Sequence, residues 1–422
     1  MIFRNTVAFV ILLLPATCQP ELSAGDWPAF RGPRGDGISD ETGVPLVWGP
    51  DRNVRWRFAL PGPGNSSPVV YRGRIFITCA ENGGHQRSLY CLDGKSGELV
   101  WQRTIEYAEE EVTHKTNPWC GSTPLAFESS IVVWHGSAGL YCYDLDGQQK
   151  WHTDLGKVGH IWGYGSSPFL HDGLIYLNFG PGEQQFVCAV DASSGKMAWK
   201  TEEPGGQNQR EPRMVGSWST PSILKVGDTS QVVCSMPTRV VSYEPATGKI
   251  LWTCGGIPSA RGDLVYTSVI SDGTTGIAMG GYQGPAMAFR LDGSGDVTSS
   301  HRLWHVERRQ PQRIGSGIII GESVYMANAG PGTIQCIDLK TGADRWQQRL
   351  SGDHWGSLIL VDGHLMVTNQ AGVTRVFRPN PGKYDPVADN DLKEPSNSTP
   401  AVSNGCLYLR TFKALYCISD KD

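Results

Sequence analysis

Short apolar runs along this chain alternate with polar turns, and one such pattern recurs several times. Each copy has an apolar segment, an Asp…Gly turn and a second segment that ends in tryptophan. Full copies cover Cys91–Trp101, Ala189–Trp199, Ser242–Trp252 and Cys336–Trp346, and Cys142–Trp151 is one residue shorter. Short apolar runs on both sides of a tight turn are typical of β-hairpins. A hairpin that returns at this regular spacing predicts a propeller or a β-solenoid rather than independent domains.

A second pattern, in which two Ser/Thr residues precede a proline, lies before these hairpins. From Ser67 to Thr399 its successive copies lie 56, 44, 53, 48, 48, 41 and 42 residues apart, which makes eight units. Most copies are followed by an apolar strand, a turn such as His171–Gly173 and another apolar strand. Four short strands per unit are what a propeller blade requires. The copies are Ser66–Pro68, Ser122–Pro124, Ser166–Pro168, Ser219–Pro221 and Ser398–Pro400, with weaker forms at Thr267–Val269, Gly315–Gly317 and Gly356–Leu358.

The two ends of the repeat region complement each other. The last unit ends at Ala414–Ile418, one strand short and without a tryptophan, and Asn53–Phe58 supplies such a strand at the other end. Pairing of these segments removes the exposed sheet edges of an open ring. We therefore predict an all-β fold, a single eight-bladed propeller of four-stranded antiparallel blades over residues 52–422, in which the N-terminal strand closes the last blade. Residues 25–51 are expected to form an extension that packs on the propeller.

Composition and charge exclude some classes of function. Gly 52, Pro 27 and 18% charged residues suit many short strands and turns, and suit helices badly. The formal net charge of −4, without a long Lys/Arg run, argues against phosphate-backbone binding, so no nucleic-acid partner is expected. After the N-terminal region, no apolar stretch approaches the ~18 residues of a membrane-spanning helix. We expect a monomer without a transmembrane segment.

The first 24 residues have the pattern of a signal peptide. Arg4 precedes the short apolar run Val7–Leu14, which is followed by small residues. An exported protein, periplasmic or extracellular, is therefore expected. A lipid anchor at Cys18 is the weaker alternative, because Pro15–Thr17 form a poor lipoprotein box.

Eleven cysteines in an exported chain would ordinarily indicate disulfides. Several of them, however, occupy a strand position that Ala189 and Ser242 fill in other repeats. A position shared by Cys, Ala and Ser requires a small side chain, so mostly buried free thiols are expected. Bridges between Cys79 and Cys91, or between Cys406 and Cys417, remain open alternatives. The cysteines at the repeat position are Cys91, Cys142, Cys336 and Cys417.

The two repeated patterns together resemble the quinoprotein-type, or PQQ-like repeat, β-propeller family. In that family an Ala-x-Asp-x-x-x-Gly-x-x-x-Trp motif docks each blade on the next, and the resemblance covers roughly residues 26–420. The segment Asp26–Pro33 looks like the one that precedes such propellers in exported bacterial proteins, notably those of planctomycetes. The resemblance implies that one indole per blade spans the gap to the next blade. These docking residues are Trp56, Trp101, Trp151, Trp199, Trp252, Trp304 and Trp346.

The same resemblance raises the question of a PQQ-dependent dehydrogenase. Such enzymes hold a calcium ion with oxygen ligands, use an Asp base and carry a disulfide of adjacent cysteines next to the quinone. This chain has no adjacent cysteines and no Cys-x-x-Cys-His. Its calcium-like segment Asp144–Gly147 lies where the other repeats have their hairpin turn. The sequence therefore predicts no PQQ, no calcium or other metal, and no catalytic residues.

The preferred interpretation is a binding or scaffold module that is not an enzyme. The outer-membrane assembly-factor lipoprotein of Gram-negative bacteria, an eight-bladed propeller that binds partner proteins, is similar in architecture. Two alternatives stay open. One is a PQQ-dependent dehydrogenase-like enzyme. The other is a carbohydrate-binding or carbohydrate-degrading propeller, and degradation would require a carboxylate pair such as Glu211 and Asp263.

The channel mouth is the predicted ligand site. The loops that enter the innermost strand of each blade open at one face, and they hold the residues just before the Ser/Thr-Pro pattern. Their aromatic, arginine and amide side chains suit a protein or a sugar-like ligand. The arginines are expected to be exposed, whereas Trp119, Trp218 and Trp355 have packing inside the channel as an equal alternative. The candidates are Asn65, His114, Asn117, Trp119, Trp162, Tyr164, Arg213, Trp218, Arg261, Tyr266, Arg313, His354, Trp355 and Asn397.

Overall fold

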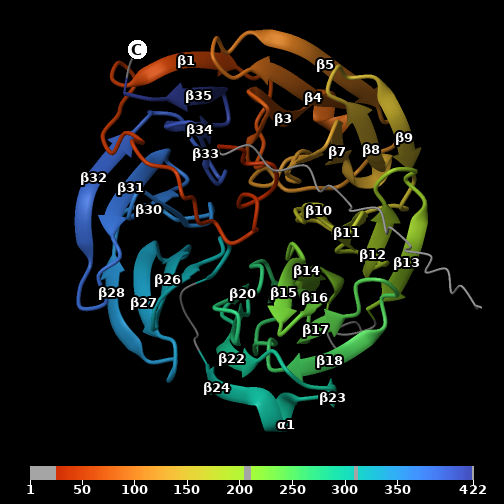
Figure 1. Ribbon diagram of the computed structural model, residues 1–422, viewed down its shortest axis with the longest axis vertical. Helices are drawn as coiled ribbons and strands as arrows, with labels where there is room; N and C mark the ends of the chain where they lie inside the picture. Colours follow the sequence, from red (N-terminus) through yellow and green to blue (C-terminus); the bar gives the residue numbers. More distant parts are fainter. Residues whose placement is uncertain (1–24, 204–210, 308–311, 421–422) are drawn as a thin grey trace, which may run out of the picture.

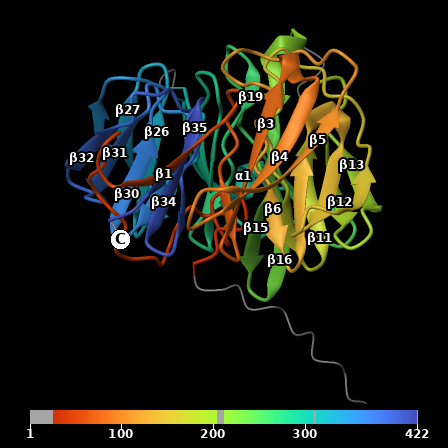
Figure 2. The ribbon, with the colours of Figure 1, turned by 90° about the horizontal axis from the view of Figure 1, so that it is seen from above.

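The chain winds its sheets around a central axis, as Figure 1 shows face-on and Figure 2 shows from the side. The computed structural model describes residues 25–203, 211–307 and 312–420. Within these ranges the strands form eight antiparallel blades built on four strands each. The predicted eight-bladed, all-β propeller is thereby confirmed.

The first four blades follow the order of the chain. Blade 1 contains β2 (Val69–Tyr71), β3 (Arg74–Glu81), β4 (Gln86–Asp93) and β5 (Leu99–Glu106). Blade 2 contains β6 (Leu125–Phe127), β7 (Ser130–Trp134), β8 (Leu140–Asp144) and β9 (Gln149–Thr153). Blade 3 contains β10 (Phe169–His171), β11 (Leu174–Phe179), β12 (Phe186–Asp191) and β13 (Met197–Glu202). Blade 4 contains β15 (Ser222–Val226), β16 (Thr229–Ser235), β17 (Arg239–Tyr243) and β18 (Ile250–Gly255).

The remaining blades complete the ring. Blade 5 contains β20 (Ile270–Ser271), β21 (Thr275–Met279), β22 (Ala286–Arg290) and β24 (Arg302–Val306). Blade 6 contains β25 (Ile318–Ile320), β26 (Ser323–Asn328), β27 (Thr333–Asp338) and β28 (Asp344–Arg349). Blade 7 contains β29 (Ile359–Val361), β30 (His364–Thr368), β31 (Val373–Arg378) and β32 (Asp385–Asp391). Blade 8 contains β33 (Ala401–Ser403), β34 (Cys406–Arg410), β35 (Ala414–Ile418) and β1 (Val54–Ala59).

Blade 8 is closed by the two ends of the propeller. Strand β1 pairs antiparallel with β35, so that Trp56 lies opposite Cys417 and Phe58 opposite Leu415. This is the closure that the split last unit predicts. The pairing covers the sheet edges that β1 and β35 would otherwise expose to solvent.

Short elements interrupt the regular blades. The connection from β22 to β24 contains the one-turn helix α1 (Thr298–His301) and β23 (Gly295–Asp296), which adds a fifth, parallel strand to blade 4 beside β18. Before blades 4 and 5, β14 (Val215–Ser217) and β19 (Asp263–Val265) pair in parallel. The 3₁₀ turns are η1 (Asn82–Gly84), η2 (Gly136–Ala138) and η3 (Pro212–Met214). None of the helices among the described residues is long and apolar enough to cross a membrane.

The docking tryptophans join consecutive blades. Trp199 Nε1, for example, donates a hydrogen bond of 2.7 Å to the Pro245 carbonyl in the turn of the next blade. The turn glycine beneath the indole, Gly248, has a φ of 71°, where a side chain would be strained and would overlap the ring. Trp252 is the exception, because its Nε1 donates to Gln231 Oε1 (2.8 Å) within its own blade. Equivalent bonds to the next blade are made by Trp56, Trp101, Trp151, Trp304 and Trp346.

The cysteines in the described ranges are free and buried, as the repeat position indicates. Cys79 lies opposite Ser88 across β3 and β4, and Cys91 lies opposite Phe76 three residues along. This register leaves no bridge between Cys79 and Cys91. The signal peptide prediction and Cys18 fall outside the described residues.

The segment before β1 runs through the middle of the ring, where it is the red ribbon of Figure 1. Trp27 and Val70 of β2 exchange two backbone hydrogen bonds of 2.8 and 3.0 Å. Further bonds hold the segment to the first strands of blades on other sides of the ring. They join Pro28 O to Ala126 N (2.7 Å), Arg31 Nη2 to Gly317 O (2.6 Å) and Ser39 N to Leu360 O (2.8 Å).

Candidate functional site

A cavity of about 690 Å³ opens where the loops that enter the innermost strands converge. This volume lies within the ~300–1,000 Å³ usual for small-molecule sites. The loops before all eight blades contribute to its wall, so the channel axis passes through it. The predicted residues that line it are Asn65, His114, Asn117, Trp162, Arg213, Trp218, Tyr266, Trp355 and Asn397.

An amide network forms one side of this channel-mouth pocket. Asn65 Nδ2 donates to Asn117 Oδ1 (3.0 Å), and Asn117 Nδ2 donates to the Trp162 carbonyl (2.7 Å). The Thr116 carbonyl accepts bonds of 2.9 Å from both Asn65 Nδ2 and Asn397 Nδ2, which ties the first blade to the last. Asn65 Oδ1 is buried and has no hydrogen-bond partner among the described residues. The network therefore presents an acceptor that a ligand donor or a cation could use.

Aromatic rings also line the pocket. The Trp218 ring lies 5.3 Å from Tyr266, and its Nε1 donates to the Gly163 carbonyl (2.8 Å). Trp162 is 39% exposed and its ring lies 4.6 Å from His114. Because Trp218 is fixed at its polar edge, its remaining surface offers an apolar face to a planar ligand.

Arg213 supplies the positive charge at the pocket. Its side chain is 63% exposed, and Nε donates to Glu211 Oε2 at 2.7 Å. An exposed ion pair of this kind contributes little stability, so an anionic ligand competes for the guanidinium at low cost. Among the described residues, the site thus combines apolar walls, amides and one solvent-accessible cation.

Some candidates from the sequence pack behind the pocket instead of lining it. Tyr164 is buried and its hydroxyl donates to the Trp119 carbonyl (2.5 Å). Trp119 Nε1 in turn donates to Glu111 O (2.7 Å). For Trp119 the structure therefore shows packing, whereas Trp218 and Trp355 reach the pocket.

The expectation of exposed, convergent arginines is wrong for two of the three. Arg313 is fully buried, with Nη1 donating to Gly284 O (2.7 Å), because its loop folds back against the preceding blade. Arg261 is exposed but does not line the pocket. His354 is also buried, with Nδ1 3.3 Å from Asn328 O, and burial lowers its pKa to about 4.

Sequence reasoning missed several lining residues. Most are apolar neighbours of the candidates within the same loops, and their side chains carry no chemistry that would single them out. Phe30 comes from the segment before the propeller, and no sequence signal places that segment in the channel. The missed residues include Phe30, Thr116, Ile161, Met214, Leu264, Tyr282, Gln312 and Ile314.

No Asp or Glu of the described residues lines the pocket. Nor do those residues contain a cluster of three or more His, Cys, Asp or Glu side chains suited to a metal ion. Glu211 is exposed and paired with Arg213, and Asp263 is buried in β19. The carboxylate pair that polysaccharide hydrolysis would need is not assembled in this pocket.

A family model described as outer membrane protein assembly factor BamB, built on PQQ-like repeats, matches residues 46–118 and 85–348. The repeats, the closed eight-bladed ring and this match define the class. The chain belongs to this PQQ-like repeat propeller family.

Solved structures of two kinds share the fold. BamB from Moraxella catarrhalis matches with a TM-score of 0.60 and 13% identity, over 86% of this chain and 99% of that one. The quinohemoprotein alcohol dehydrogenase from Comamonas testosteroni matches with a TM-score of 0.69 and 12% identity, over 94% of this chain and 81% of that one.

Curated relatives are named as dehydrogenases. A polyvinylalcohol dehydrogenase of a Pseudomonas species is 22% identical over 70% of this chain and 55% of the relative. A quinohemoprotein alcohol dehydrogenase of Pseudomonas putida is 24% identical over 49% of this chain and 30% of the relative. The chain thus spans about half or less of the length of these relatives.

These names correct the functional part of the sequence analysis. The predictions of a scaffold without catalysis and of a protein without cofactor are contradicted, because the relatives are enzymes and one is a quinohemoprotein. The missing cysteine pair misled the prediction, because the absence of one feature of such enzymes was taken to exclude the whole class.

Proposed function

We propose that this protein is a dehydrogenase of the quinoprotein kind that oxidises an alcohol in the channel-mouth pocket. The observation that carries the proposal is a cavity of about 690 Å³ on the propeller axis, with aromatic walls and one cation. The names of the curated relatives support the reaction class. The oxidised alcohol could be a small molecule, a sugar-like compound or a polymer, and all three carry the same reacting group.

The described pocket residues offer contacts to a planar, anionic quinone, but they include no Asp or Glu that could act as the base of such enzymes. Trp218 and Tyr266 offer ring faces, Arg213 offers a charge-assisted hydrogen bond to a carboxylate, and the amide network offers neutral hydrogen bonds. When bound, the quinone would supply the electron acceptor for the oxidation. Calcium takes about six to eight oxygen ligands, and the described pocket residues supply one unpartnered buried oxygen, Asn65 Oδ1, and no carboxylate, so they do not by themselves form a calcium site.

A binding assay tests the cofactor part. Purified protein is titrated with PQQ, with and without calcium, while quenching of tryptophan fluorescence is measured. We expect Arg213→Ala to weaken binding about 10- to 100-fold, because a hydrogen bond to a charged group contributes ~1.5–3 kcal/mol. Arg261→Ala is the matched control, since Arg261 is exposed but outside the pocket. Equal effects of the two substitutions would contradict the proposal.

An activity assay tests the reaction part. The protein loaded with PQQ and calcium is given ethanol, glucose or poly(vinyl alcohol), and reduction of an artificial electron-accepting dye is followed. Turnover with any of them, reduced in Trp218→Ala, supports the proposal. Retained PQQ without turnover on any alcohol would refute the enzyme assignment.

We also propose that the protein works outside the cytoplasm. The support is the family description, which names an outer membrane assembly factor, together with the signal-like residues 1–24 of the sequence. Cell fractionation of a tagged full-length protein tests this, and a signal confined to the cytoplasm would contradict it.

A further inference from the structure

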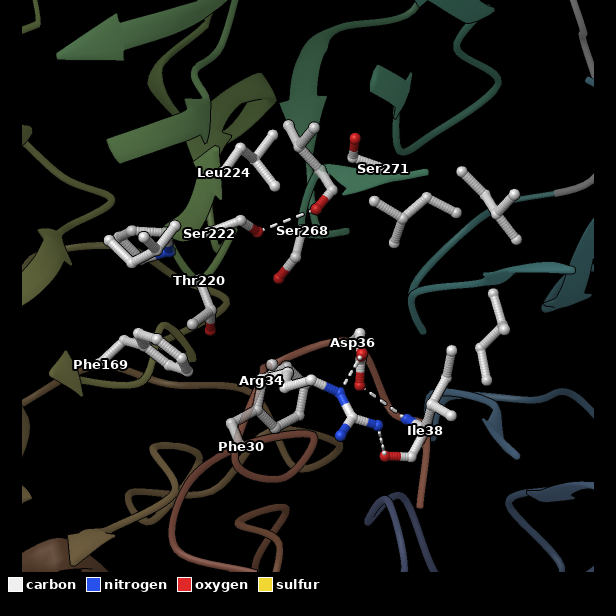
Figure 3. Close-up of a pocket in the computed structure, with 17 residues that line it drawn as sticks. Phe30, Arg34, Asp36, Ile38, Phe169, Thr220, Ser222, Leu224, Ser268 and Ser271 are labelled. Carbon is white, nitrogen blue, oxygen red and sulfur yellow. Dashed lines mark hydrogen bonds and ion pairs between the residues drawn. The ribbon is translucent and has the colours of Figure 1, made fainter. Parts of the chain in front are cut away.

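A second, smaller cavity lies farther along the same channel, where Arg34 and Asp36 of its lining are partly exposed. It has a volume of about 100 Å³ and is lined by the first strands of blades 4, 5 and 6 and by the N-terminal segment (Figure 3). The order of residues along blade 4 gives the direction. Trp218 lines the channel-mouth pocket, Thr220 lines both cavities, and Ser222 and Leu224 line the inner one.

Phe30 stands between the two cavities. Its side chain, like that of Thr220, lines both the channel-mouth pocket and the inner cavity. In Figure 3 it approaches from the N-terminal segment, on the side facing Phe169 and Thr220. An aromatic ring shared by two cavities along one axis is a partition between them.

The N-terminal segment is held in place by contacts other than the Phe30 ring. Trp27 pairs with β2 through two backbone bonds, and Arg31 donates to Gly317 O on the far side of the channel. Arg34 is fixed within the segment by Asp36 (2.9 Å) and by the Ile38 carbonyl (2.9 Å). Phe30 is only half-buried.

We propose that Phe30 is the floor of the channel-mouth pocket and limits the length of the ligand that the pocket accepts. With the ring in place the pocket is blind and takes compact planar ligands. Without it, the pocket and the inner cavity join into one longer channel. The inference concerns the same pocket as the proposed function and rests on it only for the identity of the natural ligand.

Two dyes of one chemistry and different length test the floor. The probes are 8-anilinonaphthalene-1-sulfonate (ANS) and its covalent dimer bis-ANS, both of which fluoresce in apolar sites. We expect Phe30→Ala to bind bis-ANS about tenfold more tightly than the wild type, because the longer dye buries more apolar surface. The affinity for ANS, which fits above the floor, should stay within about threefold.

Phe169→Ala is the matched control. Phe169 lines the inner cavity but not the channel-mouth pocket, so its removal enlarges that cavity without opening the partition. An equal gain for bis-ANS in Phe169→Ala, or no gain in Phe30→Ala, would overturn the proposal. If Phe30→Ala does not fold, as judged by circular dichroism, Phe30→Leu replaces it and should show a smaller gain in the same direction.

Crystal structures decide the case in which neither dye binds. A continuous channel in Phe30→Ala and separate cavities in the wild type support the floor, and a wild-type ring lying away from either cavity refutes it. These readouts need neither PQQ nor turnover. If the dye and crystal tests fail while PQQ still binds, only the proposed role of Phe30 is refuted. If those tests succeed and PQQ does not bind, only the proposed function is refuted.

Discussion

Replacement of Trp199 by alanine tests whether the docking tryptophans hold the ring together. Trp199 lies within β13, the last strand of blade 3, and is 8% exposed. Its Nε1 donates to Pro245 O of blade 4, and its ring lies 6.0 Å from Tyr176 and 6.1 Å from Tyr243. The side chain therefore contributes both buried apolar surface and a hydrogen bond to one interface between blades.

The expected loss follows from these contacts. Truncation of a buried Trp to Ala typically costs about 3–5 kcal/mol. Trp199→Phe keeps most of the ring but loses the N–H, so it should cost about 1 kcal/mol, the usual net value of a hydrogen bond. Gly248→Ala should also destabilise, because it places a methyl group against the same indole at a φ of 71°.

Urea unfolding followed by circular dichroism measures these free energies. The control is Trp162→Ala, which removes the same type of side chain from a position that is 39% exposed at the channel mouth. A loss of about 1 kcal/mol or less is expected there, since exposed positions contribute little. Equal losses for Trp199→Ala and Trp162→Ala would refute the assignment of Trp199 to docking.

Two other properties of the ring can be measured. Deletion of residues 409–422 removes β35 and the last two residues of β34, and exposes the edges of β1 and of the rest of β34. Calorimetry should therefore show a lower and broader transition, and an unchanged midpoint would contradict the closure. Burial lowers the pKa of His135 to about 3 and those of His160 and His354 to about 4. Because unfolding lets these histidines protonate near pH 6.5, the stability present above that pH should be lost as the pH falls toward 4, by roughly 1–3 kcal/mol per histidine. Urea titrations at pH 7 and pH 5 measure this loss, which His354→Asn should reduce, and equal stabilities at both pH values would contradict it.

The sequence predicts most of this fold because every blade repeats the same requirements. The glycine of each turn needs a positive φ, and the tryptophan that follows it reaches the hairpin turn of the next blade. The motif therefore predicts both a hairpin and the contact with the neighbouring blade. Trp252 shows where this reasoning ends. Its motif keeps the spacing and the turn glycine, with Glu244 in place of the aspartate, yet Trp252 bonds to Gln231 in its own blade, because the next blade has α1 and β23 in place of a tight turn. The motif in one blade does not predict the structure of the turn in the next blade.

The site was predictable only in part for a related reason. Position before the Ser/Thr-Pro pattern placed Asn65, Trp218 and Trp355 correctly at the channel mouth. It could not separate Arg213, which reaches the pocket, from Arg313, which turns back to the Gly284 carbonyl. The direction of a loop side chain depends on which neighbouring carbonyls lack donors, and this is a property of the assembled ring.

The asymmetry of the channel comes from outside the repeats. Similar blades around an axis would form a channel with a similar lining along its whole length. Any pocket in such a channel would be formed by the loops between strands alone. Here the segment before β1 crosses the axis and contributes Phe30 to both cavities. Its contacts with the blades combine backbone hydrogen bonds, such as those of Trp27 with Val70, with burial of apolar side chains such as Val44 and Trp48. The part of the chain with the weakest sequence signal thus determines how far the channel-mouth pocket extends.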